Sequence, residues 1–178
     1  IGVSDNLVIY DAKHTDMSMF AGDDGVMRIF IEARNAFGTG THQTTRMILR
    51  RLLGMDLQGK SVLDCGCGTG ILGIVASRLG ADHVLGYDID EWSSENAKHN
   101  AALNGVDNLD VLLGDASVLE GVEEKFDIVI ANINRNILIN DMPALKSRLK
   151  QDGRLILSGF YDSDVTMLEN SAKDNGMT

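Results

Sequence analysis

Five short runs of apolar residues, each followed by a stretch with helical spacing, set the pattern of this 178-residue chain. The runs are rich in Val, Ile and Leu and have the length of buried strands. They lie at residues 61–64, 83–89, 109–113, 126–131 and 153–158. Because strands alternate with helices, the pattern predicts a doubly wound α/β fold with a mostly parallel sheet, helices on both faces and right-handed crossovers.

The segments between these runs carry the signals of helix starts and ends. The expected helices lie at residues 71–79, 91–104, 137–150 and 164–173, with a further one opening near Thr45. That further helix is expected to bury Met47, Ile48, Leu52 and Leu53 and to end at Gly54. The polar helix 91–104 is expected to face the surface, and Pro143 to break the helix that contains it.

Residues 1–32 follow a different pattern, in which two short apolar runs at 6–10 and 27–32 flank a loop rich in Gly and Asp. We interpret this part as a lead-in or linker segment and assign 33–178 to the main domain. The chain starts without Met and stops just after a helix, so we expect the domain to be truncated at both ends.

Three glycines at alternate positions, Gly66, Gly68 and Gly70, follow the first strand of the main domain. Glycine tolerates positive φ and lets a ligand lie against the backbone. A strand, a glycine turn and a helix start together hold nucleotide-like ligands at the end of a parallel sheet. Residues 68–73 also spell the dinucleotide pattern GxGxxG, but Asp64 before the first glycine would repel a pyrophosphate and favour a cationic or amine-bearing ligand.

Polar residues also follow the other strands of the predicted sheet. Asp88 comes about twenty residues after the glycines, where a carboxylate would accept hydrogen bonds from two ribose hydroxyls. Asp115 and Ala116 follow the third strand, where the acid either accepts from an adenine amino group or caps the loop. Asn132 ends the fourth strand and either presents its amide to the cleft or caps the next helix.

Composition narrows the classes of function without identifying one. Apolar residues make up 44% and charged residues 24%, as in ordinary globular domains. The net charge of −10 argues against a broad nucleic-acid surface and permits a basic partner, although plain solubility also explains it. No apolar run approaches the ~20 residues of a membrane span, and no signal peptide is apparent, so we expect a cytoplasmic protein.

Two local patterns are set aside on context. Cys65 and Cys67 are too few for a structural zinc site, and we interpret them as small residues in a tight turn in a reducing cytosol. Residues 54–61 match the P-loop spacing, but they follow a helix and open a strand, which is the reverse of a P-loop. We therefore expect neither a bound metal nor nucleoside triphosphate hydrolysis.

The turn from Asp64 to Gly70 resembles the first motif of class I methyltransferases, whose cofactor is S-adenosylmethionine. Residues 36–45 and the triplet 131–133 (Ala-Asn-Ile) resemble segments of the bacterial methyltransferases that modify the eleventh ribosomal large-subunit protein. The resemblance runs from about Asn6 to the chain end, and the loop 36–45 is its specific part. It implies a Rossmann-like fold and methyl transfer to amines, namely lysine side chains and the N-terminal amine, of that basic ribosomal protein.

The resemblance also implies the site residues. Cofactor contacts are expected at Thr45 near the methionine end, Gly66 under the ligand, Asp88 at the ribose and Asn132 where methyl donor meets acceptor. A lid over the methionine end is expected from Phe37, Gly38, Thr39 and Gly40. From the spacing we add Asp64, Gly68, Asp115 and Ala116.

Two departures from the family pattern concern the substrate. We expect the family's N-terminal domain, which recognises the ribosomal protein, and its last strands to lie outside this chain. The run Asn134-Arg135-Asn136 replaces a small aliphatic run, so the lip of the acceptor site is expected to differ.

The expected reaction places an amine against the methyl group after the amine has lost its proton, since lysine has a pKa of about 10.4. No general base is evident, and a base role for His42 is less favoured than a cap. We therefore expect catalysis by positioning and desolvation, with Asn132 as the catalytic residue.

Ile133 stands where an Asn-Pro-Pro-aromatic motif has its first proline. This difference favours protein amines over DNA or glutamine as the methyl acceptor. A class I methyltransferase for another lysine or a small molecule, and a non-catalytic nucleotide-binding domain, remain alternatives.

Overall fold

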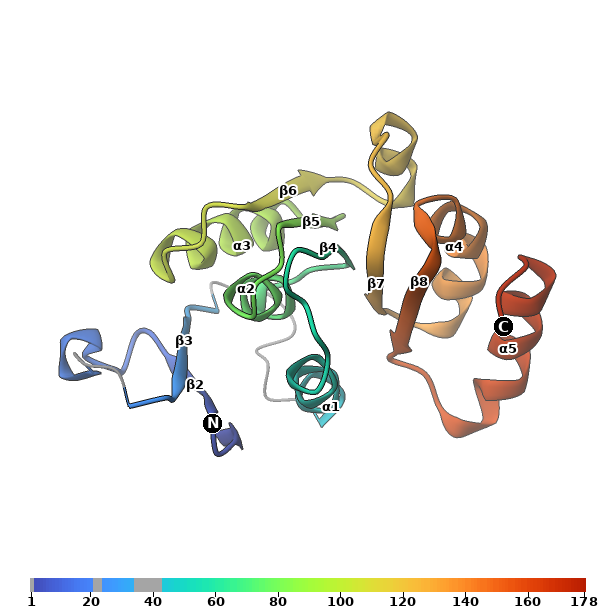
Figure 1. The fold of residues 1–178 in the computed structure, drawn as a ribbon. Coiled ribbons are helices and arrows are strands. Elements are labelled where there is room, and N and C mark those ends of the chain that lie inside the picture. Colours follow the sequence, from blue (N-terminus) through green and yellow to red (C-terminus); the bar gives the residue numbers. More distant parts are fainter. Residues whose placement is uncertain (1, 21–23, 34–42) are drawn as a thin grey trace.

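The computed structural model describes residues 2–20, 24–33 and 43–178. Five strands form its central sheet, in the order β6-β5-β4-β7-β8, and every neighbouring pair is parallel (Figure 1). Their bounds are β4 Ser61–Cys65, β5 His83–Asp88, β6 Leu109–Leu113, β7 Phe126–Asn132 and β8 Leu149–Ser158. The predicted doubly wound α/β fold is confirmed.

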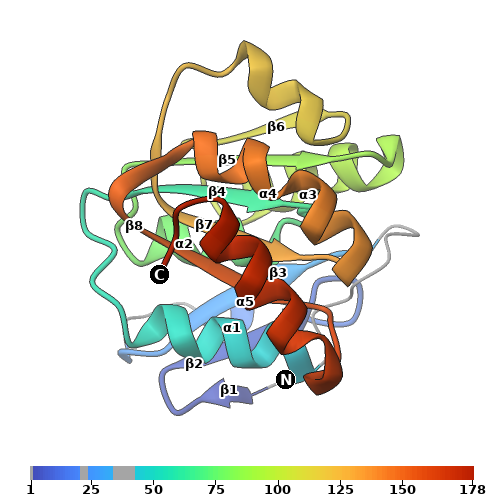
Figure 2. The same cartoon turned by 90° about the vertical axis from the view of Figure 1, so that its right-hand side faces the viewer.

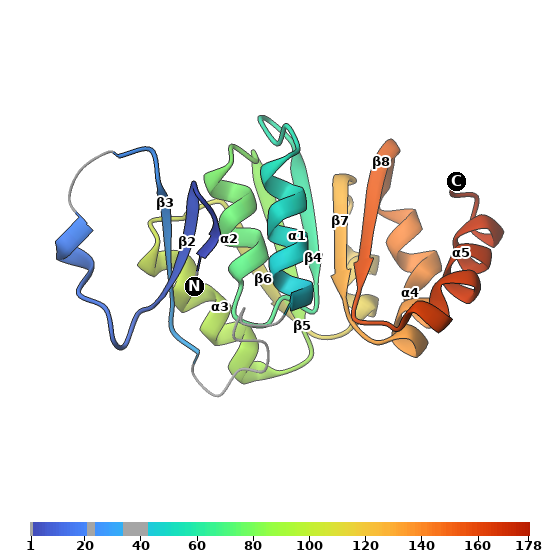
Figure 3. The ribbon, with the colours of Figure 1, turned by 90° about the horizontal axis from the view of Figure 1, so that it is seen from below.

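Helices cover both faces of this sheet. Figure 3 shows α1, α2 and α3 on one side and α4 and α5 on the other, and Figure 2 looks onto α4 and α5 in front of the strands. Their bounds are α1 Gln43–Leu53, α2 Ile71–Arg78, α3 Glu91–Leu103, α4 Arg135–Ser147 and α5 Val165–Asp174. Side chains alternate along each strand, so Val62 joins the core beneath α1 and α2 while Leu63 joins the core beneath α4. Short 3-10 helices, η2 (Ala116–Gly121) and η3 (Asp162–Asp164), precede β7 and α5.

A second sheet of three strands packs against the α1–α3 side. It consists of β1 (Gly2–Ser4), β2 (Leu7–Asp11) and β3 (Met27–Ile31), with the 3-10 helix η1 (Met17–Phe20) between the last two. Leu7 and Ile29 of this sheet lie in the same buried cluster as Leu49 of α1 and Ile74 of α2. The leading segment therefore shares its core with the main domain, and the boundary at residue 33 stays a prediction.

Helix α3 faces the surface with one side, where Glu95 and Lys98 are exposed, but it buries the other side, which was not expected. Its Ser93, Ser94, Asn96, Ala97, Asn100 and Ala101 are buried. The Asn100 side chain accepts a hydrogen bond from the Glu32 N–H at 2.9 Å and donates to the Glu32 carbonyl at 3.1 Å. It also donates to the carbonyl of Thr69 at 2.9 Å. Asn104 pairs in the same two-way manner with Phe30. The small side chains of α3 let the helix lie close to β3, and its two amides form hydrogen bonds with the backbone groups at the edge of that strand. This is why polar residues are buried on this side of α3.

Two further expectations about helices are wrong. Met47 is 65% exposed, and Leu49 is buried in its place. Pro143 lies inside α4, which continues to Ser147. Pro143 is exposed, and it costs the helix one backbone hydrogen bond and crowds the carbonyl one turn earlier, but it does not end the helix.

Across the described ranges, no helix combines the length and the apolar character that crossing a bilayer demands.

Candidate functional site

A cavity of about 790 Å³ opens at the carboxyl edge of the five-stranded sheet. It is lined by residues that follow β4, β5, β6 and β7, together with residues of α1 and α4. Of the predicted site residues, seven line it: Thr45, Gly66, Gly68, Asp88, Asp115, Ala116 and Asn132. Asp64 is buried behind this lining, and the predicted lid 37–40 lies outside the described residues. The sheet thus brings together side chains that are far apart in sequence.

The floor of the cavity is the glycine turn between β4 and α2. The N–H groups of Gly66 and Cys67 both donate to the Tyr87 carbonyl, at 2.9 and 3.0 Å, which fastens the turn to β5. Gly66 has φ +70°, and a Cβ added there would lie 2.8 Å from Cγ2 of Ile133. Only glycine fits this position, so the backbone itself forms a surface on which a flat ligand can rest.

Asp88 stands at the end of β5 with its carboxylate fixed by two backbone donors. Oδ2 accepts from the Gly68 N–H at 2.9 Å, and Oδ1 accepts from the Asp90 N–H at 3.0 Å. A carboxylate has about four acceptor positions, so each oxygen keeps one for a ligand. Two oxygens held side by side in this way suit a vicinal diol.

Asp64 lies beneath the turn and is only 2% exposed. Burial, and next the negative charge of Asp88, raise its pKa to about 7, although a hydrogen bond from the Gly73 backbone opposes the shift. Its Oδ2 atom has no hydrogen-bond partner among the described residues, and the same holds for the buried Oγ1 of Thr69 in the turn. Direct contact of Asp64 with a cofactor stays a prediction, since other residues line the cavity in front of it.

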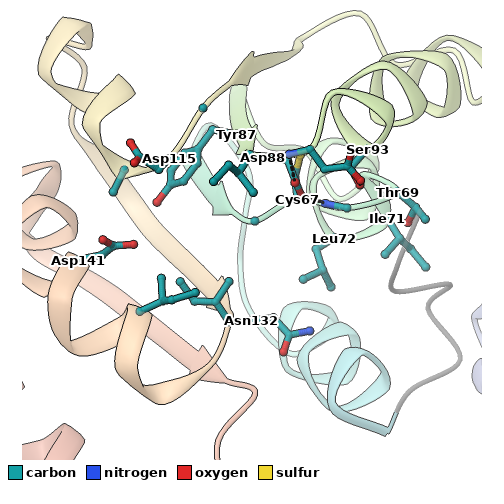
Figure 4. A pocket seen from close by; sticks show the side chains of 18 of the residues that line it. Cys67, Thr69, Ile71, Leu72, Tyr87, Asp88, Ser93, Asp115, Asn132 and Asp141 are labelled. Carbon is teal, nitrogen blue, oxygen red and sulfur yellow. Dashed lines mark hydrogen bonds between the residues drawn. The ribbon is translucent and has the colours of Figure 1, made fainter. Parts of the chain in front are cut away.

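At one end of the cavity, Asp115 and Asp141 lie near each other on different elements, with Tyr87 beside Asp115 (Figure 4). Asp115 caps η2 by accepting from the Ser117 N–H at 2.9 Å, so the loop-cap alternative describes its contacts, and its role at adenine stays a prediction. Asp141 of α4 was missed by the sequence interpretation. Its pKa is raised by burial first and by the charge of Asp115, against a hydrogen bond with Asn140.

The sequence does contain a signal for this part of the site, but it can be recognised only once the position of α4 is known. Ile137, Asn140 and Asp141 are spaced i, i+3 and i+4 in α4, which places them on one helix face, and all three line the cavity. Ile89, directly after Asp88, also lines the cavity and is 78% exposed. It offers an apolar surface beside the predicted ribose position.

The three residues of the run 134–136, after β7, have different roles. Asn134 caps α4 through its Oδ1 and the Ile137 N–H at 3.1 Å, so the cap belongs to Asn134. Arg135 pairs with Asp164 at 2.8 Å, and Asn136 lines the cavity. Asn132 also lines the cavity, and its Oδ1 accepts a hydrogen bond from the Ser158 hydroxyl at 2.7 Å.

The charge of the cavity has one sign. Its described lining includes Asp88, Asp90, Asp115 and Asp141 and contains no Lys, Arg or His. Carboxylates in a partly desolvated cavity attract a sulfonium or ammonium and repel a pyrophosphate. The glycine cradle, the Asp88 oxygens and this charge all fit S-adenosylmethionine better than a dinucleotide.

Comparison with known proteins decides the family. A family model described as "Ribosomal protein L11 methyltransferase (PrmA)" matches residues 1–178. The chain belongs to this family. It is 51% identical over 152 residues to the ribosomal protein L11 methyltransferase of Porphyromonas gingivalis, covering 85% of this chain and 52% of that protein. With the Bacteroides fragilis protein of the same name, identity is 44% over 178 residues, covering 100% of this chain and 61% of that protein. The chain thus spans roughly half to three fifths of the length of these family members.

Solved structures agree with the family assignment. A crystal structure of ribosomal protein L11 methylase from Lactobacillus delbrueckii subsp. bulgaricus has a TM-score of 0.85 and 33% identity, covering 98% of this chain and 87% of that one. A putative methyltransferase, SMU.776, solved in complex with SAH, has a TM-score of 0.63 and 17% identity, covering 77% and 41%. At that identity the second likeness shows the Rossmann-like methyltransferase fold alone.

Proposed function

We propose that this protein transfers methyl groups from S-adenosylmethionine to amines of ribosomal protein L11, on lysine side chains and the N-terminal amine. The observation that carries the proposal is Asp88, whose two oxygens are held by Gly68 and Asp90 with one acceptor position each still open. Membership of the L11 methyltransferase family supports both the cofactor and the substrate. Because ribosomal proteins are made and assembled in the cytoplasm, we place the reaction there.

We propose that residues along the cavity would hold the cofactor as follows. The Asp88 carboxylate would accept from the two ribose hydroxyls, with the Gly66 backbone beneath the ligand. Asp115 and Ala116 would meet the adenine, and Thr45 and the segment 37–40 the methionine end. When bound, S-adenosylmethionine supplies a methyl group on a positively charged sulfur. The four lining carboxylates favour that charge.

The chain's own contribution to the methyl transfer is positional. None of the described lining residues is a histidine or lysine, so the described part of the site offers no histidine or lysine as a general base for the amine. We propose that Asn132, at the end of β7, orients the neutral amine so that its lone pair meets the methyl group. Desolvation in the cavity and fixed geometry then lower the barrier. The acidic lining also attracts the cationic form of a lysine before it loses its proton.

The test measures binding and transfer in the same preparation. Calorimetry with S-adenosylmethionine and with NAD should show binding of the first and little of the second. Incubation with purified L11 and cofactor labelled in the methyl group should then label L11. Binding of NAD alone would refute the methyltransferase assignment.

The other outcomes separate the remaining alternatives. Cofactor binding with transfer to a different protein or to a small molecule would keep the reaction and refute the substrate. Binding without transfer to any acceptor would indicate a non-catalytic nucleotide-binding domain. Replacing Asn132 by Ala at saturating cofactor tests its role, because an unchanged rate is incompatible with orienting the amine.

A further inference from the structure

Asn132 and Ser158 occupy the last positions of two neighbouring parallel strands. The register of β7 and β8 pairs these two residues directly. The Ser158 hydroxyl donates to Asn132 Oδ1 at 2.7 Å. Asn132 lines the cavity and Ser158 is not part of the described lining, so the hydroxyl reaches the site through the carboxamide.

The backbone around this pair is held by close packing. Gly159 has φ +88°, and a Cβ there would lie 2.8 Å from the carbonyl oxygen of Ile133. On its other side, Ile133 places Cγ2 2.8 Å from where a Cβ of Gly66 would stand. The end of β8, the residue after Asn132 and the glycine turn therefore approach one another closely, which limits movement of the backbone that carries Ser158.

The orientation of a carboxamide matters because its two ends have opposite chemistry. The nitrogen only donates hydrogen bonds, the oxygen only accepts them, and rotation about the last side-chain bond exchanges the two. In Figure 4 the nitrogen of Asn132 lies on the side nearer Leu72, which lines the cavity, and the oxygen on the side away from it. The hydrogen bond from Ser158 to the oxygen holds this arrangement and leaves one Oδ1 lone pair unused.

We propose that Ser158 is a positioning residue, which fixes the Asn132 carboxamide with its N–H donors toward the cavity and one oxygen lone pair open for a ligand. The kinetic consequence rests on the proposed methyl transfer, whereas the orientation of the side chain does not. The two are therefore tested by separate measurements.

The first measurement is nuclear magnetic resonance of the full-length protein without cofactor. The side-chain amide pair of Asn132 is assigned by its absence from the Asn132→Ala spectrum. Ser158→Ala should shift this pair and lower its order parameter, and Ser158→Thr, which keeps the hydroxyl, should restore both. Ser147→Ala is the matched control, because Ser147 donates to the Ala144 carbonyl at 2.6 Å at the other end of the sheet. An Asn132 signal that is the same in Ser158→Ala as in the unaltered protein would overturn the proposal.

The second measurement is methyl transfer to L11 at saturating cofactor and substrate. Loss of one hydrogen bond should lower kcat about three- to tenfold in Ser158→Ala and much less in Ser158→Thr. In an Asn132→Ala background, Ser158→Ala should cause no further loss, since Ser158 acts through Asn132. An equal loss in both backgrounds would contradict this route. If the unaltered protein labels no ribosomal protein, the proposed function fails, and the resonance measurement still decides the role of Ser158.

Discussion

The two edges of the five-stranded sheet use their polar side chains in opposite ways. At the amino edge they are paired with one another. His83, which opens β5, bonds Asp110 at 2.8 Å and Glu124 at 2.7 Å. Asp127 near the start of β7 accepts from Lys150 at 3.0 Å. These contacts tie β5 to β6 and β7 to β8, and each of these side chains has a charged or hydrogen-bonded partner within the protein.

At the carboxyl edge, polar groups keep capacity that the described residues do not use. Oδ2 of Asp64 and Oγ1 of Thr69 are buried without a partner, and each Asp88 oxygen has one acceptor position to spare. Unpartnered buried polar atoms cost free energy, so a protein that keeps them has a reason to do so. The comparison teaches that spare hydrogen-bonding capacity, rather than polarity as such, marks the functional edge of this sheet.

The largest expected effect comes from the two glycines at either end of β4. Gly59 and Gly66 have nearly the same φ, +71° and +70°, but a Cβ at Gly59 meets nothing within 4 Å, while one at Gly66 meets Ile133. Gly59→Ala should cost about 1 kcal/mol of unfolding free energy, from the backbone alone. Gly66→Ala should cost about 3 kcal/mol, because crowding is added.

Urea unfolding measures both variants of this pair. Adding Ile133→Ala to Gly66→Ala should remove the contact with Cγ2 and recover part of the difference. Equal losses at the two glycines would show that the close approach to Ile133 is unimportant.

The next effect concerns the two acids at either end of β5. Asp88→Asn should weaken S-adenosylmethionine binding by about 2 kcal/mol, or roughly thirtyfold, because an amide offers one acceptor oxygen and no charge. The control is Asp82→Asn, which changes the exposed acid just before the same strand. Calorimetry should find the control unchanged. Similar losses in both would assign the effect to overall charge instead of the diol contact.

The contrast between the edges also explains what the sequence could predict. Gly66 stands directly after β4, and Asp88 and Asn132 are the last residues of β5 and β7, so local spacing was enough to place them at the carboxyl edge. Ser158 and Asp141 were missed, because they reach the site through strand register and through the packing of α4, neither of which is local.

The errors in the helices have the same origin. Helical spacing identified an apolar stripe in α1 but not its outer limit, so Met47 was assigned to the core although Leu49 occupies it. Composition made α3 polar, and only the structure shows that the edge of β3 requires the Asn100 amide.

A further effect, about 1 kcal/mol for each pH unit, is a pH dependence of stability that comes from Asp64. Its pKa rises from 3.8 to about 7 on folding, so the folded state binds more protons between these values. The contribution of Asp64 to stability should therefore be fully present below pH 4 and be lost as the pH rises toward 7, by about 1 kcal/mol per pH unit in the middle of the range. Asp64→Asn should flatten this part of the stability profile.

The pH dependence of stability that comes from Asp127, at the amino edge, has the opposite sign. Burial of Asp127 works against its charge, but bonds from Ser61 and Lys150 prevail and lower its pKa, so its stabilisation is lost as the pH falls through the folded value. Asp127→Asn should leave the slope between pH 5 and 7 as it is. If the Asp64 and Asp127 variants changed that slope alike, the buried carboxyl would not be its source.

The smallest effect is expected from His83 at the amino edge. Burial alone would lower its pKa, but the bonds to Asp110 and Glu124 outweigh it and raise the pKa above 6.5. The stabilisation is therefore complete below pH 6.5 and is lost as the pH rises through the folded value. Because the side chain is 30% exposed and Asp110 is 71% exposed, solvent screening limits the effect to about 0.5 kcal/mol. Thermal unfolding at pH 6 and pH 8 should show a stability difference that is larger by this amount in the unaltered protein than in His83→Gln, since the Asp64 contribution is common to both. Cofactor affinity should be the same in both, because His83 lies at the edge of the sheet whose polar groups are paired among themselves, and a change in that affinity would break the division between the two edges.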